Sequence, residues 1–270
     1  MTNLCRRAPA MAKLEAVRHR VLLLSLSVPL ACLLAACGAA ARTQQGESGA
    51  AAHVNRHCRS GTKQLGNRRL AVAVVVRSQS RAYRRPGRAP FARFGRVNQN
   101  GFPTVFRALA AVRRSDCRPS WYRVQLPLRP NGVTGFIQAR TVELARVRTR
   151  ILVDISSRRL TLYRSGRRVL QTTVAVGSPA TPTPTGRYYV NQRLIPSDPS
   201  GPYGPAALGV SAFSNVLTGW TQGGPIGIHG TNEPWSIGRA VSNGCIRVRN
   251  PVLRRLFAAA RAGTPVVIRP

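Results

Sequence analysis

The stretch 228-IHGTNEPWSIGRAVSNGCIRVRN-250 begins at the end of an apolar, strand-like run and continues into a loop where a glycine precedes a cysteine. His229 is the only histidine after residue 57, and Cys245 is the last of six cysteines. An imidazole can take the proton of a nearby thiol, and the thiolate can then attack a carbonyl. Sixteen positions separate the two residues, so they meet only if the loop folds back. The alternative is two unrelated residues in one segment.

The residues around this pair read as a mainly β unit over 149–270. Three short strands are expected within 150–177, one more within 181–194, a strand at 225–230 and a last one at the C-terminus. One helix is expected after Cys245. Asn250 is its candidate cap, Pro251 suits its first position and Gly263 ends it. The apolar face of this helix would be formed by Val252, Leu253, Leu256, Phe257 and Ala260.

Residues 70–146 are expected to form a separate small β-domain. The runs 70–76, 121–128 and 134–139 have the composition of strands. The last two are joined at Asn131-Gly132, which is a turn signal and predicts a hairpin.

The N-terminal part predicts export. A basic start is followed by the apolar run 21–37, which is broken by Pro29 and ends in small residues before Cys37. This describes a signal peptide over 1–37 better than a membrane span. The sequence Leu-Ala-Ala-Cys at 34–37 resembles a lipobox, which implies lipidation of Cys37; the alternative is an ordinary signal peptide with an incidental cysteine. Residues 38–69 have the composition of a flexible linker.

The chain is strongly basic, with a formal net charge of +35 that comes almost entirely from arginine. An arginine-biased proteome would explain this charge, and so would an anionic partner. Export makes a nucleic acid the weaker candidate, and neither zinc-ligand spacing nor a recognition helix supports one. An oxidising compartment permits a Cys58–Cys117 disulfide, with two unpaired thiols as the alternative.

A resemblance to a known family adds a specific reading. HGT followed by S-x-G-C-I-R-x-x-N, together with TPTPTG at 181–186, resembles the signature of the YkuD-type L,D-transpeptidase catalytic domain. The segment 121–139 is similar to the SH3-like β-domain found upstream of this domain in some relatives. The resemblance implies a cysteine acyltransferase that joins peptidoglycan stem peptides by 3→3 crosslinks and needs neither a metal nor a cofactor.

The resemblance also assigns roles. It implies that Cys245 is the nucleophile, that His229 is the general base and later the acid, and that the Gly230 carbonyl orients the imidazole. The amides of Asn243, Gly244 and Cys245 would form the oxyanion hole. Many relatives have histidine where this chain has Asn243, which leaves His229 as the single candidate base.

Other positions keep two readings. Arg247 is expected to organise the loop or to face the substrate carboxylate. The alternative is a purely structural salt bridge. Tyr203 and Trp220 are candidates for substrate contact, with core packing as the alternative. Ser242 and Asn250 are expected to serve loop hydrogen bonding and the helix cap.

The sequence therefore predicts a lipid-anchored, monomeric L,D-transpeptidase outside the cytoplasm, facing the cell wall. The same site could instead act as an L,D-carboxypeptidase or attach a protein to the wall. A non-catalytic wall-binding lipoprotein is the alternative from a different functional class.

Overall fold

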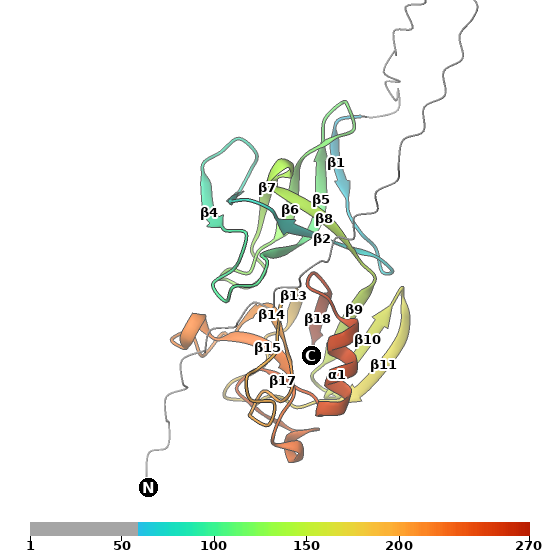
Figure 1. Ribbon diagram of the computed structural model, residues 1–270, viewed down its shortest axis with the longest axis vertical. Coiled ribbons are helices and arrows are strands. Elements are labelled where there is room, and N and C mark those ends of the chain that lie inside the picture. Colours follow the sequence, from blue (N-terminus) through green and yellow to red (C-terminus); the bar gives the residue numbers. More distant parts are fainter. Residues whose placement is uncertain (1–58) are drawn as a thin grey trace, which may run out of the picture. The chain divides into compact units, whose positions relative to one another are not determined.

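The computed structural model describes residues 59–270, and these residues fall within one compact unit of the chain (Figure 1). The predicted signal peptide, Cys37 and Cys58 lie outside the described residues. Two sheets dominate the described part, which contains one α-helix, so the prediction of a mainly β chain is confirmed. Within residues 59–270, no helix has the length and apolarity that crossing a membrane requires.

The first sheet is built from residues 61–147. Its strands follow the order β4-β3-β7-β6-β5-β2-β8, and β1 pairs with β5. Phe106, Val124 and Ile137 are fully buried in its core. The strands are β1 (Gly61–Gln64), β2 (Ala71–Val76), β3 (Ser80–Tyr83), β4 (Pro90–Phe94), β5 (Val105–Arg113), β6 (Pro119–Gln125), β7 (Thr134–Gln138) and β8 (Val142–Val147), with the 3-10 helix η1 (Ala139–Thr141) before the last.

The structure agrees with part of the prediction for this sheet. β2 forms where predicted, and β6 and β7 make the predicted antiparallel hairpin. The linker prediction is wrong at its end, because Gly61–Gln64 pairs with β5 as β1. Cys117 is disulfide-bonded. Because Cys58 lies outside the described residues, its pairing with Cys117 stays a prediction.

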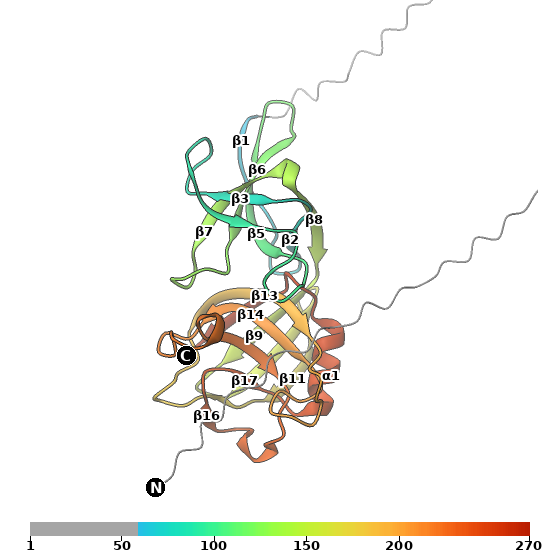
Figure 2. The same cartoon turned by 60° about the vertical axis from the view of Figure 1, so that its left-hand side comes forward.

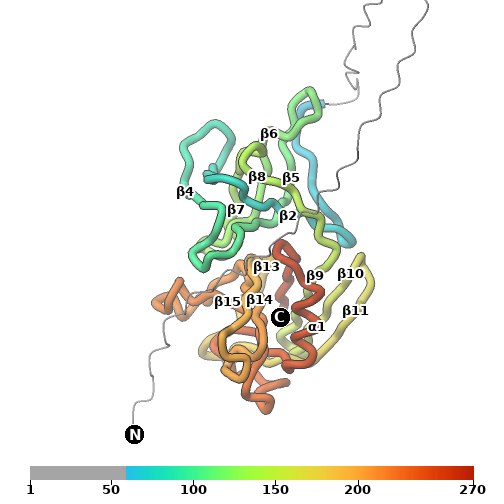
Figure 3. The backbone as a smooth tube through the Cα atoms, in the orientation of Figure 1, coloured from blue at the N-terminus to red at the C-terminus, as the bar shows by residue number. Residues whose placement is uncertain are grey.

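The second sheet carries the candidate site. Its order is β11-β10-β9-β18-β13-β14-β15-β17. The last strand of the chain, β18, pairs with β9 in parallel and with β13 in antiparallel fashion, so the C-terminus closes the middle of the sheet (Figure 3). The strands are β9 (Thr149–Asp154), β10 (Arg159–Arg164), β11 (Arg167–Thr173), β13 (Gly186–Leu194), β14 (Ala207–Phe213), β15 (Pro225–His229), β17 (Ile246–Arg247) and β18 (Pro265–Arg269).

Short elements complete this part of the chain. The helix α1 (Asn250–Ala259) buries Leu253 and Leu256 in the same core as the second sheet, as its predicted apolar face requires (Figure 2). β12 (Val176–Gly177) and β16 (Ala240–Ser242) form a two-stranded parallel sheet. Two 3-10 turns, η2 (Thr221–Gly223) and η3 (Pro234–Ser236), lie in the loops on either side of β15.

Candidate active site

Two neighbouring strands bring the predicted pair together. β15 and β17 run parallel, and Ile228 is paired with Ile246 while His229 is paired with Arg247. Successive side chains of a strand point to opposite faces of the sheet. Both isoleucines are fully buried in the core. His229 and Arg247 therefore project from the other face.

Cys245 immediately precedes β17 and lies on the same face as His229. The Gly227 N–H donates a hydrogen bond of 3.4 Å to the Cys245 Sγ. Gly227 is two residues before His229 on β15, so the thiol sits diagonally across from the imidazole on the adjacent strand. The thiol is half-buried. The 16-residue separation in sequence is thus closed by strand pairing.

The orientation of the imidazole is set by the residue that follows it. His229 Nδ1 lies 2.6 Å from the carbonyl oxygen of Gly230. A carbonyl only accepts hydrogen bonds, so Nδ1 carries the proton and Nε2 is left as the acceptor. Gly230 thus occupies the position that the resemblance implies. Glu233, four residues after His229, pairs with Arg247 and is not the group that orients the imidazole.

Burial keeps both reacting groups neutral at rest. It lowers the pKa of His229 to about 4; the Gly230 hydrogen bond opposes this shift, and the nearby Arg247 charge adds to it. Burial also raises the pKa of Cys245, against the opposing effects of the Gly227 hydrogen bond and Arg247. The resting pair is therefore a thiol beside a neutral imidazole. This arrangement suits removal of the thiol proton during attack.

Arg247 forms a salt bridge with Glu233 through Nη1 and Oε2. Its side chain is 20% exposed, and that of Glu233 is 43% exposed. Of the readings predicted for Arg247, the structural salt bridge is the one present in the structure. Arg247 still lies close enough for its charge to lower the pKa of both His229 and Cys245.

The cysteine loop is held by its own serine. The Ser242 hydroxyl donates to the carbonyl of Cys245 at 2.6 Å and accepts the amide of Gly244 at 3.2 Å. This confirms loop hydrogen bonding by Ser242. Of the three amides predicted for an oxyanion hole, that of Gly244 is thus occupied at rest. Gly244 has a φ of +105°, a conformation that glycine adopts readily, while the Asn243 side chain is exposed.

The TPTPTG segment fastens this loop from the other side. The Thr183 hydroxyl accepts the amide of Gly177 at 2.8 Å and donates to the Gly244 carbonyl at 2.9 Å. The Thr181 hydroxyl donates to the Ser242 carbonyl at 3.0 Å. The sequence predicted a family motif and a strand here, but the roles of the two hydroxyls were missed. The threonines that alternate with prolines at 181–185 were the available signal.

Asn250 has a different role from the predicted one. The N-cap position is Arg249, and no side chain caps the helix there. Instead the Asn250 Oδ1 accepts the amide of Thr231 at 2.9 Å. A Cβ added to Gly230 would lie 2.3 Å from this Oδ1 and 3.0 Å from the Gly204 Cα. The Asn250 side chain therefore binds the segment after His229 and does not cap the helix.

Of the two aromatic candidates for substrate contact, only Tyr203 lies next to His229. The Tyr203 ring packs edge-on against the His229 ring at 5.0 Å and remains 55% exposed, so it flanks the site. On the β14–β15 hairpin, Ala207 pairs with His229 at one end and Phe213 with Pro225 at the other. Trp220 lies in the loop beyond that second end. The structure therefore does not bring Trp220 to the histidine.

Comparison with known proteins bears on this site. Residues 148–268 match the family model of the YkuD L,D-transpeptidase catalytic domain. YkuD of Bacillus subtilis, whose name places it with the L,D-transpeptidases, is 39% identical over 118 residues, which are 44% of this chain and 64% of that protein. YkuD of Bacillus licheniformis is 39% identical over 121 residues, which are 45% of this chain and 66% of that protein. A crystal structure of an Enterococcus faecium L,D-transpeptidase mutant is 28% identical with a TM-score of 0.33, covering 45% of this chain and 49% of that one.

Residues 148–268 are thus similar to YkuD-type L,D-transpeptidase catalytic domains. This similarity covers the same part of the chain as the resemblance seen in the sequence. The chain spans just under two thirds of the length of the two Bacillus relatives, at 64% and 66%.

Proposed function

We propose that the chain is an L,D-transpeptidase that forms 3→3 crosslinks between peptidoglycan stem peptides through an acyl-enzyme on Cys245. The observation that carries this proposal is the arrangement of the reacting groups. A thiol and an imidazole project from the same face of two paired strands, and the Gly230 carbonyl leaves Nε2 as the free acceptor. This is the geometry of a nucleophile with an oriented base.

The first half-reaction forms the acyl-enzyme. The Cys245 Sγ attacks the carbonyl between the L-centre of the diamino acid and the terminal D-alanine while the thiol proton passes to His229 Nε2. The resulting oxyanion is stabilised by amides of the cysteine loop. Collapse breaks the C–N bond, and the imidazolium returns the proton to the amine of the departing D-alanine. A thioester remains on Cys245.

The second half-reaction resolves the thioester. The side-chain amine of a neighbouring stem attacks the thioester carbonyl and gives a proton to His229 Nε2. The C–S bond then breaks, a new amide links the two stems, and Sγ recovers the proton from the imidazolium. The half-exposed Tyr203 ring borders this site and is proposed to contact the stem peptide.

The surroundings of the enzyme belong to the same proposal. The signal pattern over 1–37 and Cys37 support a lipid anchor on the outer face of the cytoplasmic membrane, with the catalytic domain facing the wall. The first sheet would then serve as the SH3-like domain between the anchor and the catalytic domain. We propose that the enzyme acts as a monomer.

Two other outcomes use the same site. Water in place of the acceptor amine would give an L,D-carboxypeptidase, and a protein amine would give attachment of that protein to the wall. The non-catalytic wall-binding reading is disfavoured, because the thiol, the imidazole and the carbonyl that orients it are all in place.

The test is product analysis by mass spectrometry. The full-length protein and its Cys245→Ala variant are incubated with disaccharide-tetrapeptide fragments. Release of D-alanine together with a 3→3 dimer, absent in the variant, is the expected result. Release of D-alanine without dimer would replace transpeptidation by hydrolysis. Intact fragments in the presence of folded protein would contradict the proposal and favour wall binding.

A further inference from the structure

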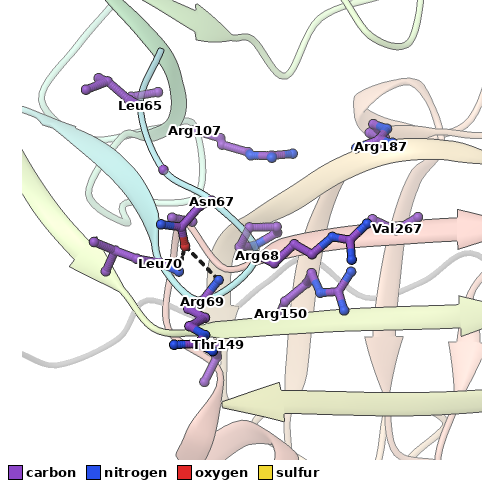
Figure 4. Close-up of a pocket in the computed structure, with 14 residues that line it drawn as sticks. Leu65, Asn67, Arg68, Arg69, Leu70, Arg107, Thr149, Arg150, Arg187 and Val267 are labelled. Atoms are coloured by element: carbon purple, nitrogen blue, oxygen red, sulfur yellow. Dashed lines mark hydrogen bonds between the residues drawn. The ribbon is translucent and has the colours of Figure 1, made fainter. Parts of the chain in front are cut away.

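A cavity away from Cys245 is lined by arginines. It has a volume of about 570 Å³ and is bordered by the loop before β2, by β5 and by the adjoining ends of β9, β13 and β18 (Figure 4). Five arginines line it: Arg68, Arg69, Arg107, Arg150 and Arg187. The residues that form this cavity have no part in the site described above.

Most of these arginines face a common space. Figure 4 shows the guanidinium ends of Arg68, Arg107 and Arg150 directed into the cavity, toward the side on which Arg187 lies. The Arg69 side chain lies next to Gly166 in the β10–β11 turn instead. Its Cγ would be 3.1 Å from a Cβ added at Gly166. Burial lowers the pKa of Arg107, and the neighbouring charge of Arg187 lowers it further.

The protein supplies this cluster with no counter-charge from its described part. Residues 59–270 contain five aspartate and glutamate side chains, and none of them lines the cavity. Four of them are in salt bridges, with Arg77, Arg114, Arg247 and Arg269. The fifth, Asp198, accepts hydrogen bonds from Ser200. Within the described residues, the buried Arg150 Nε has no hydrogen-bond partner.

The arginines are held in place by their surroundings. The Asn67 Oδ1 accepts the amides of Arg69 and Leu70 at 2.8 and 3.0 Å, which fixes the loop that carries Arg68. The Arg150 guanidinium lies 4.5 Å from the centre of the Tyr163 ring. The Gln125 side-chain amide donates to the backbone carbonyl of Arg187. These contacts anchor the Arg150 side chain and the backbone that carries Arg68 and Arg187.

The geometry points to an anion-binding site in this cavity for a ligand with adjacent phosphate groups, such as a polyphosphate or a phosphodiester polymer. Guanidinium groups bind phosphate oxygens in a bidentate manner. A phosphate directs its oxygens tetrahedrally and can meet several such groups that approach from different directions, whereas a carboxylate offers two oxygens in one plane. The cavity is large enough for more than one phosphate.

Calorimetric titration of the full-length protein with tripolyphosphate at physiological salt tests the site. The paired variant Arg150→Gln/Arg187→Gln is expected to weaken binding by about tenfold or more, because two guanidinium partners of the phosphates are lost. The matched control is Arg254→Gln/Arg255→Gln, which removes the same charge from exposed positions of α1 and should bind as the native protein does. Cys245→Ala should also bind normally, which separates this proposal from the proposed catalytic function.

Further arms of the experiment distinguish specific binding from general attraction. Citrate should bind more weakly than tripolyphosphate at the same salt concentration. Equal weakening by the cavity and control pairs would contradict the proposal, because it would show attraction to the net charge alone. If the glutamine pair unfolds, Arg150→Lys/Arg187→Lys keeps the charge and removes the planar fork, and it should still weaken binding.

The source of the phosphate is tested with vesicles of anionic phospholipid. Cavity-dependent binding to these vesicles, without binding to tripolyphosphate, would assign the site to a lipid headgroup. Cavity-dependent binding to tripolyphosphate would assign it to a soluble or polymeric phosphate. Binding to neither, or binding to both that the cavity variant does not weaken, would overturn the site.

Discussion

The imidazole of His229 is oriented by the carbonyl of the next residue, Gly230, at a distance of 2.6 Å. Gly230 allows the close packing around this carbonyl, because the Asn250 side chain and the Gly204 backbone occupy the space where a Cβ would lie. Three segments thus combine to place one acceptor.

Asn250 is therefore expected to support catalysis from a distance. Asn250→Ala leaves the buried Thr231 amide without its acceptor, which should destabilise the fold by about 1–3 kcal/mol. The loosened Gly230 carbonyl should also lower kcat about tenfold with little change in KM. Asn250→Asp keeps the acceptor oxygen and should retain more activity. Urea unfolding and steady-state kinetics measure both effects; equal activity in the alanine variant and the native protein would show that the contact does not position the site.

The pKa of His229 predicts how stability depends on pH. This pKa is about 4 in the folded chain, below the ordinary 6.5. Between these values the unfolded chain binds the proton and the folded chain does not. Stability should therefore fall as the pH drops from 6.5 toward 4, by up to about 3 kcal/mol from this residue.

Urea unfolding of the native protein and of His229→Gln across this pH range measures the contribution. The variant should lose less stability on acidification, since it has no imidazole to titrate. Parallel curves for the two proteins would refute the assignment. The acid limb of kcat/KM should likewise lie well below pH 6.5, because the base stays neutral there.

Thr183 is predicted to hold the cysteine loop. Thr183→Val is close in shape but removes the hydroxyl, leaving the Gly177 amide and the Gly244 carbonyl without their partner. We expect a loss of about 2 kcal/mol or more in stability and a fall in kcat of about tenfold or more. Thr183→Ser retains the hydroxyl and serves as the control. A valine variant as active as the serine variant would show that the loop keeps its geometry without the hydroxyl.

The neutral resting pair predicts slow alkylation of Cys245. Its pKa is raised by burial, so little thiolate is present at neutral pH. Iodoacetamide should react with Cys245 more slowly at pH 7 than with a free cysteine, and the rate should rise with pH above the ordinary thiol range. Peptide mapping after timed quenching measures the rate at this position. Rapid alkylation at neutral pH would instead indicate a preformed thiolate–imidazolium pair.

Short stretches of sequence predicted those helices and strands whose formation depends mainly on neighbouring residues. The apolar spacing along α1 predicted its buried face, because a helix repeats over a few residues. The short apolar run that ends at His229 predicted β15, because the composition of a few neighbouring residues is enough to indicate a buried strand. β5 was missed, since VFRALAAVR contains several alanines and no clear alternation, and it is a strand only because β1, β2 and β6 pair with it.

The candidate site likewise contains residues that local sequence predicts and contacts that it does not. The motif predicted the thiol, the imidazole and the carbonyl, which are fixed by short segments. The partner of Arg247, the contact made by Asn250 and the two threonine hydroxyls depend on segments that meet only in the folded chain. Trp220 was assigned to the site by its nearness in sequence, and the hairpin register places it at the other end.

The acyl group on Cys245 is the intermediate on which the proposed mechanism depends, and intact-protein mass spectrometry detects it. The full-length protein is mixed with a tetrapeptide donor whose side-chain amine is blocked, so that no acceptor can resolve the intermediate. We expect a covalent adduct equal to the donor minus D-alanine, mapped to Cys245 and absent in Cys245→Ala. Release of D-alanine with no adduct on trapping, or an adduct that persists in the variant, would contradict it.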